Sequence, residues 1–225
     1  TQRAQVSGAG SGLVAYYNFD DVNNIGADSA GSNTGTAMNG ASQTTGKVGS
    51  GALNLDGVND YVKMNSITSL KKAGAITVSA WVKPNVKWST ICSSCIRPYI
   101  QSGREFGIGA LWDGGNTSRL YFGYDTIDFT SVSEPQVGSW THIAFTYDAN
   151  TNTVIYYKNG IASSPKTYNG SLIPDLGSIF EVGRDPIDGG YFNGSIDEVR
   201  LYNRALSASE VLDLYNFSGQ QIIQL

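Results

Sequence analysis

The stretch that decides the fold is Phe192-Asn-Gly-Ser-Ile-Asp-Glu-Val-Arg-Leu-Tyr-Asn-Arg-Ala-Leu-Ser-Ala-Ser-Glu-Val-Leu-Asp-Leu-Tyr215. Its first half predicts a β-strand, because Ile196, Val199 and Leu201 are apolar residues of the strand-forming type. Its second half predicts a short helix. The chain therefore ends in a strand that leads directly into a helix.

The helix has a clear start. Ser207 followed by Glu210 forms a capping box, in which the serine hydroxyl accepts a helix N–H and the glutamate reaches back to the N–H of Ser207. Leu206 and Val211 occupy the two positions of a hydrophobic staple. The apolar face of the helix is expected to consist of Val211, Leu212, Leu214 and Tyr215.

Other segments alternate with the period of a β-strand. Ile76 to Val82 alternates apolar and polar residues, and Thr141 to Tyr147 places Ile143, Phe145 and Tyr147 on one side. Further along, Asn159-Gly160 is a strong hairpin signal, because both residues tolerate a positive φ. These segments predict antiparallel strands joined by tight turns.

The same segments resemble the laminin-G-like jelly rolls of the concanavalin A-like lectin/glucanase superfamily. Besides the closing stretch, the resemblance rests on Gly12–Asp20, Gly46–Val62, Ile76–Pro84, Gly138–Asp148 and Tyr157–Gly160, which follow in the family's order. It implies an all-β fold, a two-sheet antiparallel β-sandwich (jelly roll, concanavalin A-like) with one short C-terminal helix.

The 225 residues suffice for one large domain. We expect the jelly roll to cover residues 12–218, after a linker or truncated stub at 1–11 and before a C-terminal tail at 219–225. The net charge of −4 argues against nucleic acid and against anionic membrane surfaces. No stretch approaches the ~20 apolar residues of a membrane span. The polar, Lys-poor composition indicates an extracellular or cell-surface protein.

The two cysteines, Cys92 and Cys95, allow several interpretations. A small loop-closing disulfide in an oxidising compartment is favoured. Zinc needs about four ligands, and the chain offers a single histidine. A redox pair needs a βαβ context that the sequence lacks, and a plain thiol pair remains as the other option.

The sequence predicts no catalytic site. The superfamily's glucanases place two carboxyls on one strand face, but Glu181 and Asp185 have the wrong spacing for that arrangement. Asp197 and Glu198 are adjacent and should point to opposite faces of a strand. We expect His142 to be a packed, hydrogen-bonded core residue.

The resemblance also implies a structural calcium ion. Carried over residue by residue, it nominates Asp20, Gly57, Asn59 and Asp197 as ligands. The alternative is that the Asp and Asn residues occupy turns, where their side chains bond the local backbone.

A sugar site pairs an aromatic face with a few fixed polar groups. Aromatic residues outside the strand pattern are Trp88, Tyr99, Trp112 and Tyr191, and polar residues near them are Arg97, Asp113, Arg184 and Asp185. We expect some of these eight to cluster on one loop edge. The alternative for each aromatic residue is ordinary packing. Trp81 and Trp140 fall inside strands and are assigned to the sandwich.

These observations predict a non-catalytic, lectin-like adhesion module of a larger surface or secreted protein, such as an adhesin or pilus component. The expected partner is a glycan or glycoprotein, with a host or matrix protein as the second option. The alternatives are a protein-binding or structural laminin-G-like domain and an accessory module of a polysaccharide-degrading enzyme.

Overall fold

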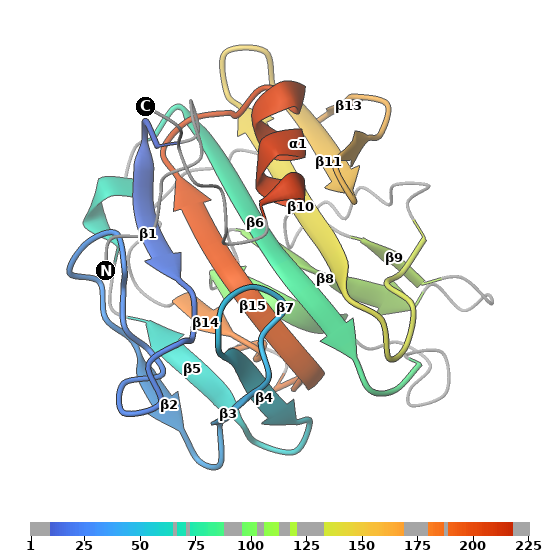
Figure 1. Cartoon of the computed structure of the whole chain (residues 1–225). Helices are drawn as coiled ribbons and strands as arrows, with labels where there is room; N and C mark the ends of the chain where they lie inside the picture. The colour runs from blue at the N-terminus through green and yellow to red at the C-terminus, as the bar shows by residue number, and fades with distance from the viewer. Residues whose placement is uncertain are drawn as a thin grey trace.

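The computed structural model describes residues 10–64, 67–70, 73–87, 96–102, 106–112, 118–120, 133–168, 180–186 and 189–217. In this part of the chain, two antiparallel sheets pack face to face, and one α-helix lies on the outer face of the larger sheet (Figure 1). The predicted β-sandwich with one C-terminal helix is therefore confirmed. Among the residues described, no helix has the length and hydropathy that a membrane crossing requires.

The larger sheet has nine strands in the order β12-β11-β10-β6-β15-β4-β3, with β1 paired to β15 and β13 paired to β11. Its long strands are β6 (Ala75–Pro84), β10 (Thr141–Asp148) and β15 (Asn193–Tyr202). The others are β1 (Leu13–Tyr17), β3 (Ser42–Thr44), β4 (Ala52–Asp56), β11 (Thr153–Lys158), β12 (Ile161–Ala162) and β13 (Lys166–Thr167).

The smaller sheet has six strands in the order β2-β5-β14-β7-β8-β9. They are β2 (Thr36–Met38), β5 (Tyr61–Met64), β14 (Phe180–Val182), β7 (Ile96–Ser102), β8 (Phe106–Trp112) and β9 (Ser118–Leu120). Because β14 joins β5 to β7, segments far apart in the sequence meet at the centre of this sheet.

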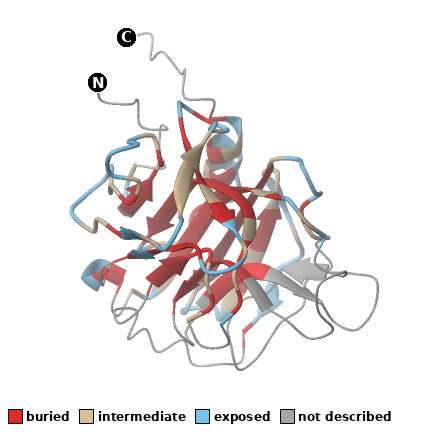
Figure 2. Cartoon of the chain, turned by 90° about the horizontal axis from the view of Figure 1, so that it is seen from below, coloured by how far each residue is buried: buried red, intermediate tan, exposed pale blue. Residues whose placement is uncertain are grey.

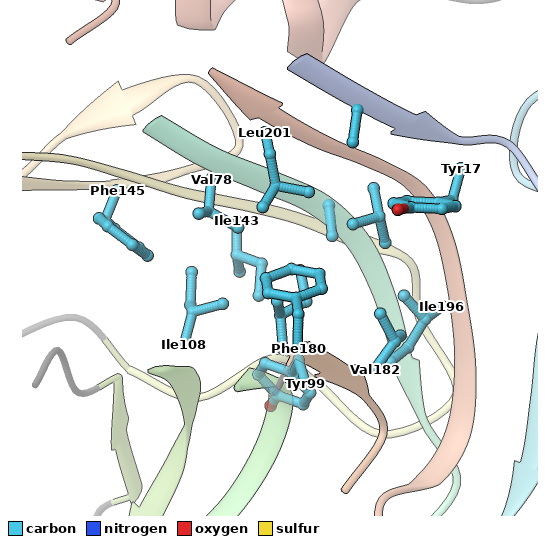
Figure 3. Close-up of a cluster of buried hydrophobic side chains, with 14 of the residues drawn as sticks. Tyr17, Val78, Tyr99, Ile108, Ile143, Phe145, Phe180, Val182, Ile196 and Leu201 are labelled. Carbon is cyan, nitrogen blue, oxygen red and sulfur yellow. The ribbon is translucent and has the colours of Figure 1, made fainter. Parts of the chain in front are cut away.

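The core fills the space between the two sheets. In Figure 3, Val78, Ile143, Phe145 and Leu201 of the larger sheet face Ile108, Phe180 and Val182 of the smaller one. Buried residues run along both sheets, while exposed residues gather in the turns (Figure 2). The predicted inward side of β10 is confirmed, since Ile143, Phe145 and Tyr147 all belong to this core.

The α-helix α1 (Ala208–Asn216) covers the outer face of the larger sheet. Its capping box is present as predicted, with Ser207 and Glu210 bonded reciprocally. Val211 and Leu214 are buried against a second apolar cluster that includes Leu206 and Tyr202. Leu212, in contrast, is 44% exposed. The buried face of the helix therefore contains fewer residues than the four that were predicted.

Trp81 belongs to this outer layer and not to the interior of the sandwich. Its ring stacks on Tyr215 of α1 with centroids 5.5 Å apart, and it makes an edge contact with His142 at 5.3 Å. His142 is buried as predicted, but both of its ring nitrogens lack a hydrogen-bond partner. The expectation that its side chain is hydrogen-bonded was therefore wrong.

A β-bulge in β15 corrects another expectation. The register with β6 shifts between Asp197 and Arg200, and Glu198 has a φ of 55°. As a result, the carboxylates of Asp197 and Glu198 both lie on the outer face of the larger sheet. Asp197 Oδ2 accepts from the N–H of Val48, and Glu198 Oε2 accepts from Arg200, whose guanidinium contacts the Phe217 ring. Adjacent residues of a regular strand would point to opposite faces, but a bulge removes that alternation.

The buried ion pair predicts a large stability effect. The side chain of Glu198 is 0% exposed, that of Arg200 is 6% exposed, and Glu198 also accepts from the Tyr16 hydroxyl at 2.7 Å. We expect Glu198→Gln to lower the free energy of unfolding by about 3 kcal/mol, because it leaves the guanidinium buried without its counter-charge. Urea denaturation measures this change. Asp213→Asn, which makes the same change at an exposed helix position, should leave stability within about 0.5 kcal/mol.

The helix cap predicts a dependence on pH. The bond from Arg204 lowers the pKa of Glu210 to about 2, against an opposing effect of burial, and the bonds from Ser207 add to the lowering. A carboxylate whose folded pKa is depressed stabilises the fold above its unfolded pKa, and this contribution disappears as pH falls toward 2. Thermal melts of Glu210→Gln and the native protein should therefore differ near pH 6 and converge near pH 2. A constant difference over this range would contradict the assignment.

Candidate functional site

Two tyrosines and an arginine meet at the outer face of the six-stranded sheet. The guanidinium of Arg184 lies 4.8 Å from the ring centroid of Tyr61 and 5.8 Å from that of Tyr191. The two ring centroids are 6.4 Å apart. An arginine between two aromatic rings is held by cation–π attraction, so these three side chains form a defined cluster.

The backbone around Gly183 places this cluster. Gly183 follows β14 with a φ of 88°, and a Cβ there would lie 2.3 Å from Leu55 Cδ1. Its N–H donates to the carbonyl of Tyr99, and its carbonyl accepts from Phe192. A β-bridge then joins Arg184 to Tyr191. Because glycine adopts this positive φ without strain, the chain can turn here and bring Arg184 beside Tyr191.

Glu181 lies beneath the arginine. In β14 it alternates with the core residues Phe180 and Val182, so it points outward, directly between Lys63 of β5 and Gln101 of β7. It is only 2% exposed. Its Oε1 accepts from Arg184 Nη1 at 3.3 Å, whereas its Oε2 has no hydrogen-bond partner. The outer face of the small sheet thus has a buried carboxylate at its centre.

The pKa of Glu181 is raised above its usual value. Burial is the main cause, and the negative charge of Asp185 adds to it, while Arg184 and Lys63 act in the opposite direction. Asp185 is itself fully buried. Its N–H donates to the carbonyl of Gly190 and its carbonyl accepts from Gly189, which closes the turn between the two sides of the loop.

The structure brings together three of the eight residues predicted for ligand binding: Arg184, Asp185 and Tyr191. Tyr99 lies elsewhere, because it is 0% exposed and packs edge-on against Phe192 in the core. Trp88, Asp113 and the proposed disulfide partners Cys92 and Cys95 fall outside the described residues. Arg97 and Trp112 belong to β7 and β8, and their side chains are outside the described set.

Sequence reasoning missed Tyr61 and Glu181. Both lie in short strands, where the alternation of Tyr61 and Lys63 with the core residues Val62 and Met64 was available as a signal. That alternation identifies an outward face, but it does not show which other strands lie beside it. Only the pairing of β5 with β14 brings Tyr61 near the loop after Glu181.

The four residues nominated for calcium do not surround one point. Gly57 lies against Asn193 at one end of β4, and Asp197 lies four residues further along β15, about 13 Å away. Calcium ligands lie ~2.3–2.6 Å from the ion. The set therefore does not fit a single calcium ion. Within the described part of the chain, no three His, Cys, Asp or Glu side chains gather into a metal site.

Asp20 and Asp197 instead bind the backbone of one segment, residues 47–51. Asp197 Oδ2 accepts from the N–H groups of Lys47 and Val48 at 2.8 and 3.0 Å. Asp20 Oδ1 accepts from the N–H groups of Ser50 and Gly51 at 2.7 and 2.9 Å. These bonds join segments that are 150 and 30 positions apart, so they are not the local turn bonds of the alternative assignment. Calcium binding by another set of ligands stays a prediction.

A cleft of about 270 Å³ lies on the opposite side of the molecule, beside α1. Its lining is Lys47, Val48, Trp81, Tyr215, Asn216 and Phe217. Lys47 Nζ lies 4.6 Å from the Trp81 ring centroid, and the tryptophan is only 5% exposed, so its ring is already covered. Burial, reinforced by the charge of Arg200, lowers the pKa of nearby His142 to about 3, which keeps the imidazole neutral at physiological pH.

Comparisons with known proteins agree with this architecture. A family model described as the concanavalin A-like lectin/glucanases superfamily matches residues 56–212. Domain 4 of AbnA, a GH43 extracellular arabinanase from Geobacillus stearothermophilus solved in complex with arabinotriose, is 26% identical with a TM-score of 0.69. The match covers 90% of this chain and 98% of that domain. No curated protein matches the sequence.

Two more distant structures share the fold. Trypanosoma rangeli sialidase is 18% identical with a TM-score of 0.68, over 94% of this chain and 33% of the enzyme. The binding domain of Paraclostridial Mosquitocidal Protein 1 is 19% identical with a TM-score of 0.67, over 94% of this chain and 53% of that domain. This chain thus spans about a third of the sialidase and about half of the binding domain.

The contact between Arg184 and Glu181 can be tested by titration. Because Arg184 lowers the pKa of Glu181 against the effect of burial, Arg184→Gln should raise that pKa further. The side-chain carboxyl ¹³C shift of Glu181, followed against pH, measures it. Lys166→Gln, an exposed position on β13, serves as the charge-matched control and should leave the titration unchanged. An identical midpoint in the Arg184 variant would show that the two groups do not interact.

Proposed function

Because the chain belongs to the concanavalin A-like lectin/glucanase superfamily, we propose that it is a carbohydrate-binding module whose ligand contacts the outer face of the six-stranded sheet. The observation that carries this proposal is the cluster of Tyr61, Arg184 and Tyr191 above the buried carboxylate of Glu181. It combines aromatic faces with fixed polar groups, which is the combination that sugar recognition needs.

Each member of the cluster has a role in this proposal. Tyr191 is partly exposed and presents an aromatic surface for the apolar face of a sugar ring. Arg184, whose side chain is 27% exposed, supplies N–H donors for sugar hydroxyls. Glu181 supplies an acceptor and holds the guanidinium in place. Because Tyr61 is largely buried, its ring fixes the position of Arg184 from below.

The relative with a bound oligosaccharide supports a glycan ligand. Domain 4 of the arabinanase was solved with arabinotriose, and its match extends over almost its whole length. The sequence identity of 26% does not extend the proposal to arabinan as this chain's own ligand. It supports an oligosaccharide as the class of ligand.

We further propose that the module is non-catalytic. Retaining hydrolysis requires two carboxyls that both reach the glycosidic bond, about 5–5.5 Å apart. Of the two carboxyls near the cluster, Asp185 is 0% exposed and Glu181 is 2% exposed and bonded to Arg184. His142 lies on the outer face of the other sheet, against Trp81. Among the described residues, His142 and Asp185 therefore do not face a ligand that contacts Glu181.

The biological setting that we propose is a larger extracellular or cell-surface protein, such as an adhesin or a pilus component, in which this domain supplies affinity for a glycan or glycoprotein. The second candidate is an accessory module of a polysaccharide-degrading enzyme. The arabinanase match favours this second candidate, because that relative is one domain of such an enzyme.

The test is glycan binding by the native domain and by two tyrosine variants. Tyr191→Ala should weaken the strongest interaction about tenfold, since an aromatic contact contributes ~0.5–1.5 kcal/mol. Tyr215→Ala removes a tyrosine from the cleft on the opposite side and should leave affinity unchanged. Affinity electrophoresis in polysaccharide gels, with calcium and with a chelator, measures both. If Tyr215→Ala alone abolishes binding, the ligand occupies the cleft beside α1. If the native domain binds no glycan, a protein partner is the better explanation.

A further inference from the structure

The two members of the ion pair each keep one polar atom without a partner. Glu181 Oε2 is a buried acceptor and Arg184 Nε is a buried donor, and neither forms a hydrogen bond. The two residues are in direct contact through Glu181 Oε1 and Arg184 Nη1 at 3.3 Å. Buried polar atoms in folded proteins are nearly always paired. The unpaired acceptor and the unpaired donor belong to two residues in contact, and a hydrogen-bonding group from outside the chain would pair both.

A hydroxyl group matches this pair. It donates one hydrogen bond and accepts others, so it can donate a hydrogen bond to Glu181 Oε2 and accept one from Arg184 Nε. Two neighbouring hydroxyls on one sugar ring satisfy the two atoms equally well. A carboxylate, by contrast, only accepts, and would leave Glu181 Oε2 without a donor.

The charges around the cluster point the same way. The described cations, Arg184 and Lys63, face the carboxylates of Glu181 and Asp185 and are balanced by them. Because these charges are already balanced, the described cations offer no unpaired charge to a ligand carboxylate, which would lose its hydration on binding. A neutral ligand does not incur that desolvation cost.

We infer that this site selects neutral sugars through their hydroxyl groups and discriminates against sugars that carry a carboxylate. The inference rests on the proposed function and names its ligand class. Arg184 is the exposed member of the pair, with 27% of its side chain accessible against 2% for Glu181. A ligand therefore contacts Arg184 first, and the inferred contact with Glu181 requires the Arg184 side chain to move, because Glu181 Oε2 is buried.

The experiment compares two classes of glycan at pH 8. The native domain is applied to an array of neutral glycans and of glycans that carry sialic or uronic acids, and the strongest ligand is then titrated by calorimetry. We expect neutral glycans to bind. Glu181→Gln should weaken that binding about tenfold, because an acceptor that is charged bonds a hydroxyl more strongly than an amide oxygen does. Asp213→Asn, the same change on exposed α1, should have no effect.

A second variant guards against a folding defect in the first. Arg184→Lys keeps the positive charge but removes the Nε donor, and it should weaken neutral-glycan binding as well. Thermal melts establish that each variant is folded. Preferential binding of acidic glycans, or tighter binding by Glu181→Gln, would overturn the inferred selectivity while leaving glycan binding intact. Unchanged affinity in both variants would also overturn it. An array with no signal from the native domain would overturn the proposed function itself.

Discussion

The architecture depends on a pair of adjacent buried carboxylates in the central strand β15. The bulge at Glu198 turns both Asp197 and Glu198 to the outer face of the larger sheet, where burial and the charge of Glu198 raise the pKa of Asp197 to about 8. Three backbone N–H groups bond Asp197 and oppose that shift, and Arg200 neutralises Glu198. These groups hold the 47–51 segment and the end of α1 against the sheet. Charges in such a place are costly unless each one is paired, so the outer layer is specified by polar contacts as well as by its apolar cluster.

The two outer faces of the sandwich consequently differ in the side chains that they cover and expose. On the larger sheet, the helix and its neighbours cover Trp81 and His142, and the remaining cleft is partly filled by Lys47. On the smaller sheet, the described surface carries a partly exposed arginine between two tyrosines. Gly183, whose φ of 88° would strain another residue, sets the loop that completes this cluster. The packed core between the sheets is the rigid support for the cluster, which lies on the outer face of the smaller sheet.

Sequence patterns predicted the parts of the fold that depend on residues close together in the chain. The capping box at Ser207, the alternation in β10 and the turn at Asn159-Gly160 each involve residues a few positions apart, and the structure contains all three. The candidate site is different, because Tyr61 and Glu181 are 120 positions apart and meet only through strand pairing. Tyr99 looked like a loop residue because an irregularity in β7, between Pro98 and Ile100, breaks the alternation that would have marked it. The four residues nominated for calcium could not be placed from the sequence, because strand pairing puts Gly57 and Asp197 at different points along β15.

The pairing of β1 with β15 has a consequence for the way the domain is joined to anything else. Leu13 lies opposite Tyr202, the carbonyl of Gly12 accepts from the N–H of Asn203, and Arg204 Nε donates to the carbonyl of Ser11 at 2.7 Å. The first strand therefore lies beside the segment that leads into α1, and the guanidinium of Arg200 contacts the rings of both Tyr16 in β1 and Phe217 after α1. A unit closed in this way can be spliced into a surface turn of a host chain, or its ends can be joined by a short linker and new ends opened at a turn, with little disturbance of either sheet.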